Sequence, residues 1–359
     1  MENRVYNFAA GPSMLAEVVL RRLKEELFNY NDTGMSVMEM SHRSKIYLEI
    51  YEKTKADLKK LMGINEDYEV FFMHGGATGV FASLPMNLLR NRADYIVTGN
   101  FSNKAAKEAM KYGQVNVIYD GKDNGYARIP DLKELFFDED ADYIHLCANN
   151  TIYGTEWKIF PDTGNIPLIA DMSSDILSRK VNVSDFGMIY AGAQKNMGIA
   201  GLAVIIIRKD LIKDAMKITP SIMDYALSQK NDSMLNTPAT YPLYVLGKVL
   251  EWLDELGGID EIEKRNIAKA KVLYDYLDSQ SFYRPHAQKD SRSLMNVTFT
   301  TPDPELDALF ASEATKQGMV NLKGHRLVGG IRASIYNAMP AEGVNKLVTF
   351  MDEFRKEHE

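Results

Sequence analysis

The sequence has little cysteine, no surplus of basic charge and no long apolar run. Cys147 is the only cysteine among 359 residues, so no disulfide can form within the chain. The formal net charge is -7, and this mildly acidic balance argues against nucleic acid or an anionic membrane as the main partner. It does not exclude a small anionic ligand, because binding one needs only local positive charge.

Two further absences bear on the cell compartment. The longest apolar run, 202–208, has the length of a strand and falls short of the roughly 20 residues that span a bilayer. The first residues, MENRVYNFAAGPS, lack the apolar stretch of a signal peptide. Because a single thiol also suits a reducing compartment, we expect a cytoplasmic protein. The six histidines show no ligand spacing with cysteine or carboxylates, so we expect no metal site.

From Tyr68 to Arg208 the chain alternates short apolar runs with amphipathic segments. Runs that are apolar throughout suit strands covered on both faces. Alternation of strands with helices predicts an α/β fold with a mostly parallel sheet. The predicted strands are 68–75, 93–100, 115–120, 141–149, 166–173, 188–193 and 202–208, and the predicted helices are 77–89 and 102–113.

After Tyr241 the pattern changes. Two long amphipathic segments, 241–256 and 259–280, are separated by Gly257-Gly258 and predict two helices. The remaining chain predicts a smaller α+β unit, with strands at 293–301 and 326–336 and helices at 305–318 and 341–357.

Polar residues follow several of the predicted strands. Because ligands of open α/β sheets gather outside the carboxyl ends of the strands, we expect these residues along one edge. They are His74-Gly75-Gly76-Ala77-Thr78-Gly79, Asn100-Phe101-Ser102, Thr151, Asp171 and Gln194-Lys195.

This set meets the needs of pyridoxal phosphate. Lys195 can form an imine with the cofactor, and Asp171 can hold the pyridine nitrogen protonated. Phe101 can stack on the ring, and the turn from Gly75 to Thr78 can bind the phosphate through backbone N–H groups at a helix start.

Each residue alone also has an ordinary interpretation. A Gly-Gly pair before a helix is usually a tight turn, Asp171 could cap a helix, Phe101 could be a core residue and Lys195 a surface lysine. The glycine turn is neither GxGxxG nor a Walker A loop, so it gives little support to a nucleotide site. The order of the residues, each at a strand end, favours the cofactor. The stretch from Asp171 to Lys195 is long enough for one helical crossover between neighbouring strands.

Basic residues form a second group. Arg332 follows Gly-Gly in a predicted strand and could clamp a substrate carboxylate with two parallel hydrogen bonds. The pairs His42-Arg43 and His325-Arg326 exceed that need and suggest a second anion, such as a phosphate. Either pair alone is equally typical of an ordinary surface.

At these residues the chain resembles the phosphoserine aminotransferases, class V members of the fold-type I pyridoxal-phosphate transaminases. The resemblance runs nearly end to end, and AGAQKN and GIRASIYNAM are its most specific parts. It rests on NFAAGP from Asn7, MSHRS, HGGATG, LIADMSSDILSR, YAGAQKNMG, Asn236-Thr237-Pro238 and GHRLVGGIRASIYNAM.

The resemblance implies a large cofactor domain, 16–262, and a small domain, 263–359 together with 1–15. It also implies a homodimer with the active site at the subunit interface. Lys195 would carry the cofactor as a Schiff base and act as the catalytic base. The other cofactor residues would be Ala77, Thr78, Phe101, Thr151, Asp171 and Gln194, with Asn236 and Thr237 from the other subunit. The substrate residues would be His42, Arg43, His325, Arg326 and Arg332.

Three positions depart from the family pattern. Phe101 stands where many members carry Trp, which keeps stacking but shrinks the platform. Thr78 stands where Arg often follows Gly-Gly-Ala, so one positive charge is missing. Ala10 stands where some members have Ser, which removes a polar contact. The last two affect substrate binding rather than the reaction class.

The expected reaction is transfer of the amino group of L-glutamate to 3-phosphooxypyruvate, with a second activity in pyridoxine synthesis as an extension. The alternatives are another class V enzyme, such as an alanine–glyoxylate transaminase or a cysteine desulfurase, or a non-catalytic binding module. A desulfurase needs a reactive cysteine on a mobile loop, whereas Cys147 lies in an apolar strand.

Overall fold

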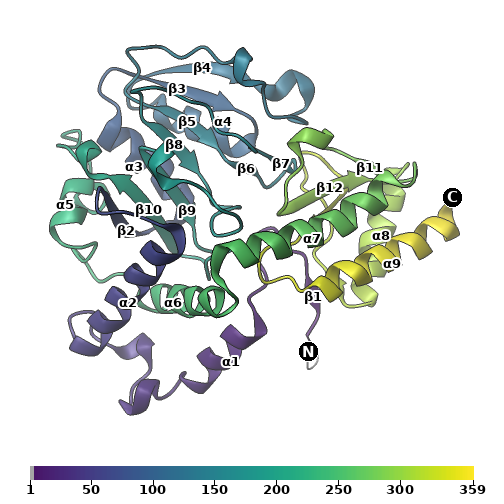
Figure 1. The fold of residues 1–359 in the computed structure, drawn as a ribbon, viewed down its shortest axis with the longest axis horizontal. Helices are drawn as coiled ribbons and strands as arrows, with labels where there is room; N and C mark the ends of the chain where they lie inside the picture. Colours follow the sequence, from purple (N-terminus) through teal and green to yellow (C-terminus); the bar gives the residue numbers. More distant parts are fainter. Residues whose placement is uncertain (1–3) are drawn as a thin grey trace.

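The computed structural model describes residues 4–359 and centres on a seven-stranded sheet with the order β2-β10-β9-β8-β5-β3-β4 (Figure 1). Every neighbouring pair runs parallel except those of β10, which is antiparallel to both β9 and β2. The prediction of a mostly parallel α/β sheet is therefore confirmed. The strands are β2 (Tyr68–His74), β3 (Arg92–Val97), β4 (Gln114–Asp120), β5 (Ile144–Cys147), β8 (Leu168–Asp171), β9 (Met188–Gly192) and β10 (Leu202–Arg208).

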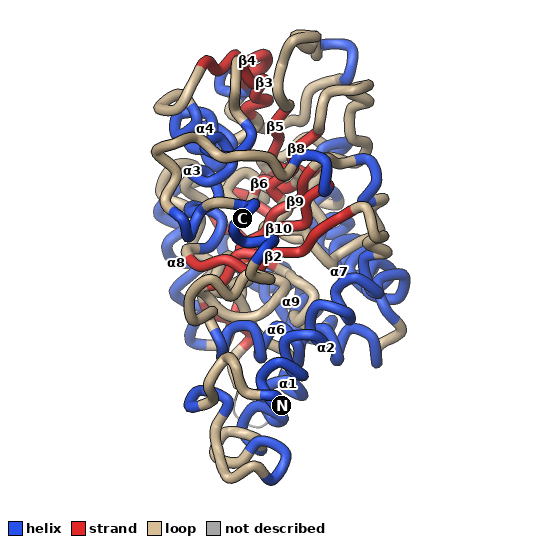
Figure 2. The backbone as a smooth tube through the Cα atoms, turned by 90° about the vertical axis from the view of Figure 1, so that its left-hand side faces the viewer, coloured by secondary structure: helices blue, strands red, loops and turns tan. Residues whose placement is uncertain are grey.

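The sheet is covered on both faces, which explains why its central strands are apolar throughout. Successive residues of β10 alternate between two cores: Val204 and Ile206 belong to one, and Ala203 and Ile205 to the other. Helices α3 and α4 complete one core, and α2 and α6 complete the other (Figure 2). The helices of this part are α1 (Glu17–Glu25), α2 (Lys45–Met62), α3 (Gly76–Leu88), α4 (Asn100–Ala109), α5 (Tyr225–Lys230) and α6 (Thr240–Glu255).

The C-terminal part builds a smaller layered unit. Gly257 and Gly258 both have positive φ and reverse the chain between α6 and α7, as the Gly-Gly pair predicted. The core of this unit combines residues between Ala270 and Phe354 with Phe8 and Met14 from the N-terminal segment. Its elements are α7 (Gly258–Asp278), the antiparallel sheet β11 (Arg284–Pro285), β12 (Asn296–Thr300) and β14 (Ile331–Ser334), the helices α8 (Pro304–Lys316) and α9 (Ala341–His358), and the parallel pair β1 (Tyr6–Asn7) and β13 (Met319–Val320).

The connection from β8 to β9 is not helical. Between Asp171 and Met188 there is no α-helix, only turns and a 3-10 turn at Val183–Asp185, although the connection is long enough for a helical crossover. The Asp171 carboxylate accepts bonds from Ser173, which folds the chain into a tight turn where a helix would otherwise begin. The turn segment is buried, so the carbonyls of Ile176, Leu177 and Ser178 are satisfied by side chains from other elements.

Two negative findings concern the described residues 4–359. Within them, no helix is both long enough and apolar enough to cross a membrane. The same residues contain no cluster of three or more His, Cys, Asp or Glu side chains placed to hold a metal ion.

Candidate active site

A cavity of about 280 Å³ lies at the carboxyl ends of β2, β5, β8 and β9, where the sequence placed its polar residues. The sheet and the C-terminal unit both contribute to its walls. Its lining comprises Ala10, Gly11, Gly75, Gly76, Ala77, Thr78, Phe81, Phe101, Cys147, Asn149, Thr151, Ile152, Asp171, Ser173, Ser174, Gln194, Lys195, His325 and Arg332.

Lys195 is the basic group at the centre of the cavity. Its side-chain amine donates to Thr151 Oγ1 at 2.6 Å and lies 5.4 Å from the centre of the Phe101 ring. The residue is only 9% exposed, and burial lowers the pKa of the amine, an effect that Asp171 opposes and Arg332 reinforces. A lowered pKa increases the fraction of neutral amine, the form that can act as nucleophile or base. Ser13 Oγ donates to the Lys195 carbonyl at 2.5 Å and fixes its backbone.

Asp171 ends β8 and is 4% exposed. Its Oδ1 accepts from the backbone N–H of Ser173 at 2.9 Å and from the Ser173 hydroxyl at 2.6 Å. The same hydroxyl accepts from Gly192 N at 3.0 Å, which ties the carboxylate to β9. Burial raises the pKa of Asp171, and the Ser173 bonds and Lys195 oppose that rise. The carboxylate is thus held in one orientation, ready to pair with a cationic ring nitrogen.

The glycine turn joins β2 to α3. Gly75 and Gly76 adopt positive φ angles of 93° and 60°, which suit glycine, and α3 begins with no side-chain cap. Its first N–H groups are therefore available to an anion at the positive end of the helix. Ala77 and Thr78 border the cavity here, and the Gln194 side chain lies against Gly192 beside Ala77.

Arg332 enters from β14 and reaches the same cavity as Lys195. One of its terminal nitrogens donates to the Thr151 carbonyl at 3.3 Å, whereas Nε is buried and has no partner among residues 4–359. Since a buried guanidinium N–H normally has an acceptor, this unpartnered donor indicates a place for an anionic ligand.

The predicted strand 326–336 is wrong in its first half. Only Ile331–Ser334 is extended, and residues 324–330 form a turn in which Gly329 and Gly330 have positive φ. The His325 carbonyl accepts from Gly329 N at 2.8 Å, and His325 Nδ1 accepts from Leu327 N at 3.2 Å. The turn points His325 at the cavity and leaves Arg326 exposed outside its lining.

Several predicted residues do not line the cavity of their own chain. Arg43, Asn236 and Thr237 are exposed, and His42 is half-buried with no partner for its Nε2 among residues 4–359. The Thr237 carbonyl contacts His74 Nε2 at 3.1 Å, which places it beside the glycine turn.

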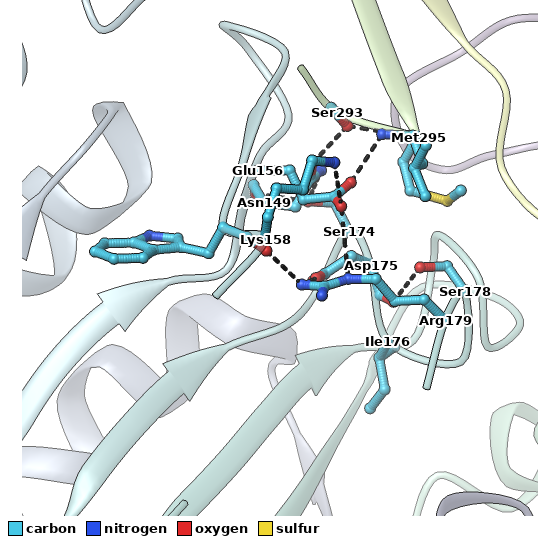
Figure 3. Close-up of polar contacts among 12 residues, drawn as sticks. Asn149, Glu156, Lys158, Ser174, Asp175, Ile176, Ser178, Arg179, Ser293 and Met295 are labelled. Atoms are coloured by element: carbon cyan, nitrogen blue, oxygen red, sulfur yellow. Dashed lines mark hydrogen bonds and ion pairs between the residues drawn. The ribbon is translucent and has the colours of Figure 1, made fainter. Parts of the chain in front are cut away.

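A layer of buried polar residues adjoins the cavity, and its contacts were not predicted from the sequence (Figure 3). Asn149 donates to Ser174 Oγ and to Asn296 Oδ1, both at 2.8 Å, and so joins the Asp171 segment to β12. Arg179 donates to Asp175 Oδ2 at 3.3 Å and lies 3.5 Å from Glu156 Oε1. Ser174, Asp175 and Arg179 lie within the LIADMSSDILSR motif, whereas no motif marks Asn149 and Glu156, which lie in a short hairpin, β6 (Asn149–Asn150) and β7 (Thr155–Glu156).

Cys147 also lines the cavity but is 3% exposed, and burial raises the pKa of its thiol. A protonated, buried thiol is inert, as the sequence predicted, so the geometry does not support a desulfurase.

Comparison with known proteins identifies the family. The family model described as aminotransferase class-V matches residues 5–347. The chain belongs to the class-V aminotransferases. Membership of this family confirms the predicted fold class, the enzymatic nature of the protein and its use of pyridoxal phosphate.

Individual relatives of this class-V aminotransferase agree over their whole length. A phosphoserine aminotransferase of Lysinibacillus sphaericus is 50% identical over 362 residues, with 100% of both chains covered. The solved phosphoserine aminotransferase of Bacillus circulans is 44% identical, with a TM-score of 0.98 and 100% of both chains covered. A pyridoxal-phosphate-bound phosphoserine aminotransferase of Trichomonas vaginalis is 37% identical, with a TM-score of 0.93, covering 97% of this chain and 100% of that one.

The cavity of this class-V aminotransferase fits its cofactor on structural grounds. It contains a buried lysine, a carboxylate held in one orientation, an aromatic ring and an uncapped helix start. These groups match the aldehyde, the pyridine nitrogen, the ring face and the phosphate of pyridoxal phosphate, respectively.

Proposed function

We propose that the chain is a phosphoserine aminotransferase, which transfers the amino group of L-glutamate to 3-phosphooxypyruvate and yields O-phospho-L-serine and 2-oxoglutarate. The observation that carries the proposal is that Lys195, Asp171 and Arg332 line one cavity. The names of relatives about half identical to the chain over its full length support the choice among class V reactions. A role in serine biosynthesis follows from this activity.

Bound pyridoxal phosphate supplies the electron sink for the chemistry at the substrate's Cα. Lys195 would have two tasks: its amine would hold the cofactor, and as a free amine it would accept the proton from the substrate's Cα. Its bond to Thr151 Oγ1 directs the amine, and its lowered pKa increases the neutral form that accepts a proton. Asp171 would stabilise a protonated pyridine nitrogen, and the Phe101 ring would supply a face on which the cofactor ring can stack.

Arg332 binds the α-carboxylate that glutamate and phosphoserine share. Its unpartnered Nε and its position beside Thr151 O direct that carboxylate toward Lys195. The substrate phosphate, or the side-chain carboxylate of glutamate, would then meet His325 and Arg326 of the turn 324–330, with His42 and Arg43. One site can thus accept both substrates, because each carries an α-carboxylate and an anionic tail.

We also propose a cytoplasmic homodimer with active sites at its interface. Asn236 and Thr237 are exposed and lie outside the cavity lining of their own chain, which supports a role for these residues in the partner's site. The core composition supports the domains 16–262 and 263–359 with 1–15, because Phe8 and Met14 pack with the C-terminal residues. The pyridoxine-pathway substrate, 3-amino-2-oxo-4-phosphonooxybutanoate, has the same two anionic ends and is a second candidate.

The test is a half-reaction followed through the cofactor's absorbance. Glutamate should shift the spectrum of the holoenzyme, and 3-phosphooxypyruvate should restore it, whereas Lys195→Ala should abolish both changes. Alanine with glyoxylate is the competing pair, because a plain alanine–glyoxylate transaminase would not need the His-Arg groups. A preparation that turns over alanine and glyoxylate but not the phosphorylated acceptor would contradict the proposal. A protein that binds no cofactor would favour a non-catalytic module.

A further inference from the structure

Three consecutive carbonyls in the turn after Asp171 each accept a hydrogen bond from an asparagine side chain of a different element. These carbonyls, at residues 176–178, belong to the turn segment that connects β8 to β9. Backbone N–H groups do not reach these carbonyls in the turn, so side-chain amides donate to them instead. The bonds run from Asn196 Nδ2 to Ile176 O at 3.1 Å, from Asn337 Nδ2 to Leu177 O at 2.9 Å, and from Asn266 Nδ2 to Ser178 O at 2.9 Å.

The three asparagines also bond to one another. Asn337 N donates to Asn196 Oδ1 at 3.0 Å, and Asn266 Nδ2 donates to Asn337 Oδ1 at 2.8 Å. All three are buried, with exposures of 5% for Asn196, 1% for Asn266 and 9% for Asn337. We call Asn196, Asn266 and Asn337 the asparagine lock.

The asparagine lock connects the segments that carry the charged groups of the cavity. Asn196 directly follows Lys195, and residues 176–178 belong to the turn that starts at Asp171. Asn337 lies just beyond β14, the strand that carries Arg332. The three charged groups therefore share one rigid hydrogen-bonded support although none of the asparagines lines the cavity.

Helix α7 anchors the asparagine lock through two side chains on one face. Asn266 reaches Ser178 and Asn337, and Lys269, one turn further on, donates to the carbonyls that follow β14. The Lys269 amine is 2.7 Å from Tyr336 O and 3.1 Å from both Ile335 O and Met339 O. The loop that holds Asn337 is thus fixed independently of the cavity.

Proton transfer at the substrate's Cα depends strongly on the placement of Lys195, since a shift of about 1 Å can cost a hundredfold in rate. Leu177 has a φ of 60°, a conformation that costs a non-glycine residue free energy and persists only where the surroundings hold it. The lock bonds supply that restraint at Leu177 and at both of its neighbours.

We propose that Asn196, Asn266 and Asn337 are positioning residues, whose shared hydrogen bonds fix the Lys195 backbone against the Asp171 turn and the loop after Arg332. The inference rests on the proposed function for its kinetic consequence. Its structural consequence, a joint restraint of segments far apart in sequence, does not depend on the reaction.

The experiment compares Asn337→Ala with Asn87→Ala in the holoenzyme. Asn87 is a matched control: it is 2% exposed, its Nδ2 donates to Ser83 O and Met223 O, its Oδ1 accepts from Tyr225 N, and it lies outside the cavity lining. Both variants lose buried hydrogen bonds, so both should be less stable to heat.

Hydrogen exchange of the holoenzyme is the first measurement. Because each lost bond weakens local protection, Asn337→Ala should speed amide exchange about tenfold in residues 172–179 and in residues 335–340 together. Asn87→Ala should leave both segments unchanged. Acceleration confined to residues 335–340, with 172–179 as in the parent, would overturn the joint restraint.

The second measurement is the single-turnover rate with glutamate. Asn337→Ala should slow it about tenfold or more with little change in the apparent Kd for glutamate, because a misplaced base lowers the rate of proton transfer more than binding. Asn87→Ala should keep the parent rate despite its lower stability. Equal rates in the two variants would overturn the positioning role.

A third variant covers the case in which Asn337→Ala does not fold. Asn266→Ala removes the bonds to Ser178 and Asn337 but keeps those of Asn196, so a smaller rate loss of the same kind is expected. If amide exchange and the single-turnover rate of Asn266→Ala equal those of the parent, the asparagine lock has no positioning role. A parent holoenzyme that is inert with glutamate would contradict the proposed function instead, and the exchange data would still test the lock.

Discussion

At the scale of single residues, Asp175 is the most unusual group outside the cavity. It is buried, one carboxylate oxygen pairs with Arg179, and the other has no partner among residues 4–359. Burial raises its pKa to about 7, with Arg179 opposing the rise and Glu156 and Asp171 adding to it. Such a group is more easily charged in the unfolded chain than in the folded one.

This raised pKa predicts a pH-dependent effect of Asp175→Asn. The folded pKa lies above the ordinary value of 3.8, so burial of Asp175 costs no ionisation free energy below about pH 4, and this cost grows as the pH rises to about 7. Asparagine keeps an acceptor for Arg179 without the charge. The variant should therefore gain stability over the wild type at pH 8, on the order of a few kcal/mol, and less at pH 5.

Denaturant unfolding at the two pH values measures this difference. Asp275→Asn is a suitable control, because its carboxylate is 62% exposed and forms a surface ion pair with Lys271 across one helical turn. A gain for Asp175→Asn that is equal at pH 5 and pH 8 would show that ionisation of Asp175 is not the cause.

At the scale of elements, the turn 324–330 decides where His325 and Arg326 lie. Gly324 closes this turn, with its N–H donating to Gly330 O at 2.7 Å, and a Cβ added there would collide with the Gly329 carbonyl oxygen. The turn is partly exposed and lies outside the main cores, so a substitution should move it without unfolding the protein.

Gly324→Ala should therefore reproduce the selective defect expected of Arg326→Ala. Both should raise KM for O-phospho-L-serine roughly tenfold or more and affect a neutral amino acid far less, because a charge-assisted contact to the phosphate is lost. Gly329→Ala is the control, since an added Cβ meets nothing within 4 Å and only the strain of φ 76° is added. Steady-state kinetics with both amino donors measures the effect. An equal rise in KM for the two donors would show that this turn does not recognise the phosphate.

The elements also show what the sequence could predict. Strands such as β9 and β10 were predictable because their residues are buried on both faces, apart from Arg208 at the end of β10, which leaves a nearly unbroken apolar run. The antiparallel direction of β10 was not predictable, because an apolar run looks the same whether the strand is parallel or antiparallel to its neighbours. The turn after Asp171 could not be told from a helix start, because Asp-Met-Ser-Ser suits both, and only the bonds from Ser173 decide between the two.

The site was predictable in part for a similar reason. Lys195, Asp171 and the glycine turn follow strand ends and use residue types that the cofactor requires. The asparagine lock was not predictable, because Asn196, Asn266 and Asn337 come together only in the folded chain and asparagine has no chemistry that a motif could reveal. The position of Arg332 was predicted from the Gly-Gly pair that precedes it, although the first half of its predicted strand is a turn.

At the scale of the whole molecule, shared active sites can be tested by mixing two inactive variants. Lys195→Ala and the double variant Asn236→Ala, Thr237→Ala place their defects in different subunits of one site. A hybrid dimer then has one site with both defects and one with neither. Random mixing should restore roughly a quarter of the wild-type activity, since half of the dimers are hybrids with one intact site.

Activity measured after refolding the mixed variants together checks this expectation, and mixing each variant with itself is the control. Refolded mixtures no more active than their components would show that Asn236 and Thr237 serve their own subunit's site, or none.

The pairing of β1 with β13 has a consequence for synthesis on the ribosome. Tyr6 lies opposite Met319, so the first strand of the chain finds its partner only after roughly 300 further residues have been made. At about 5–20 residues per second, this delay amounts to roughly 15–60 s. Ser13, which fixes the Lys195 backbone, lies in the same N-terminal segment as β1 and gains its anchor only then. A nascent chain can therefore build its large sheet early, but Lys195 is fully held in place only once the C-terminal unit has been translated.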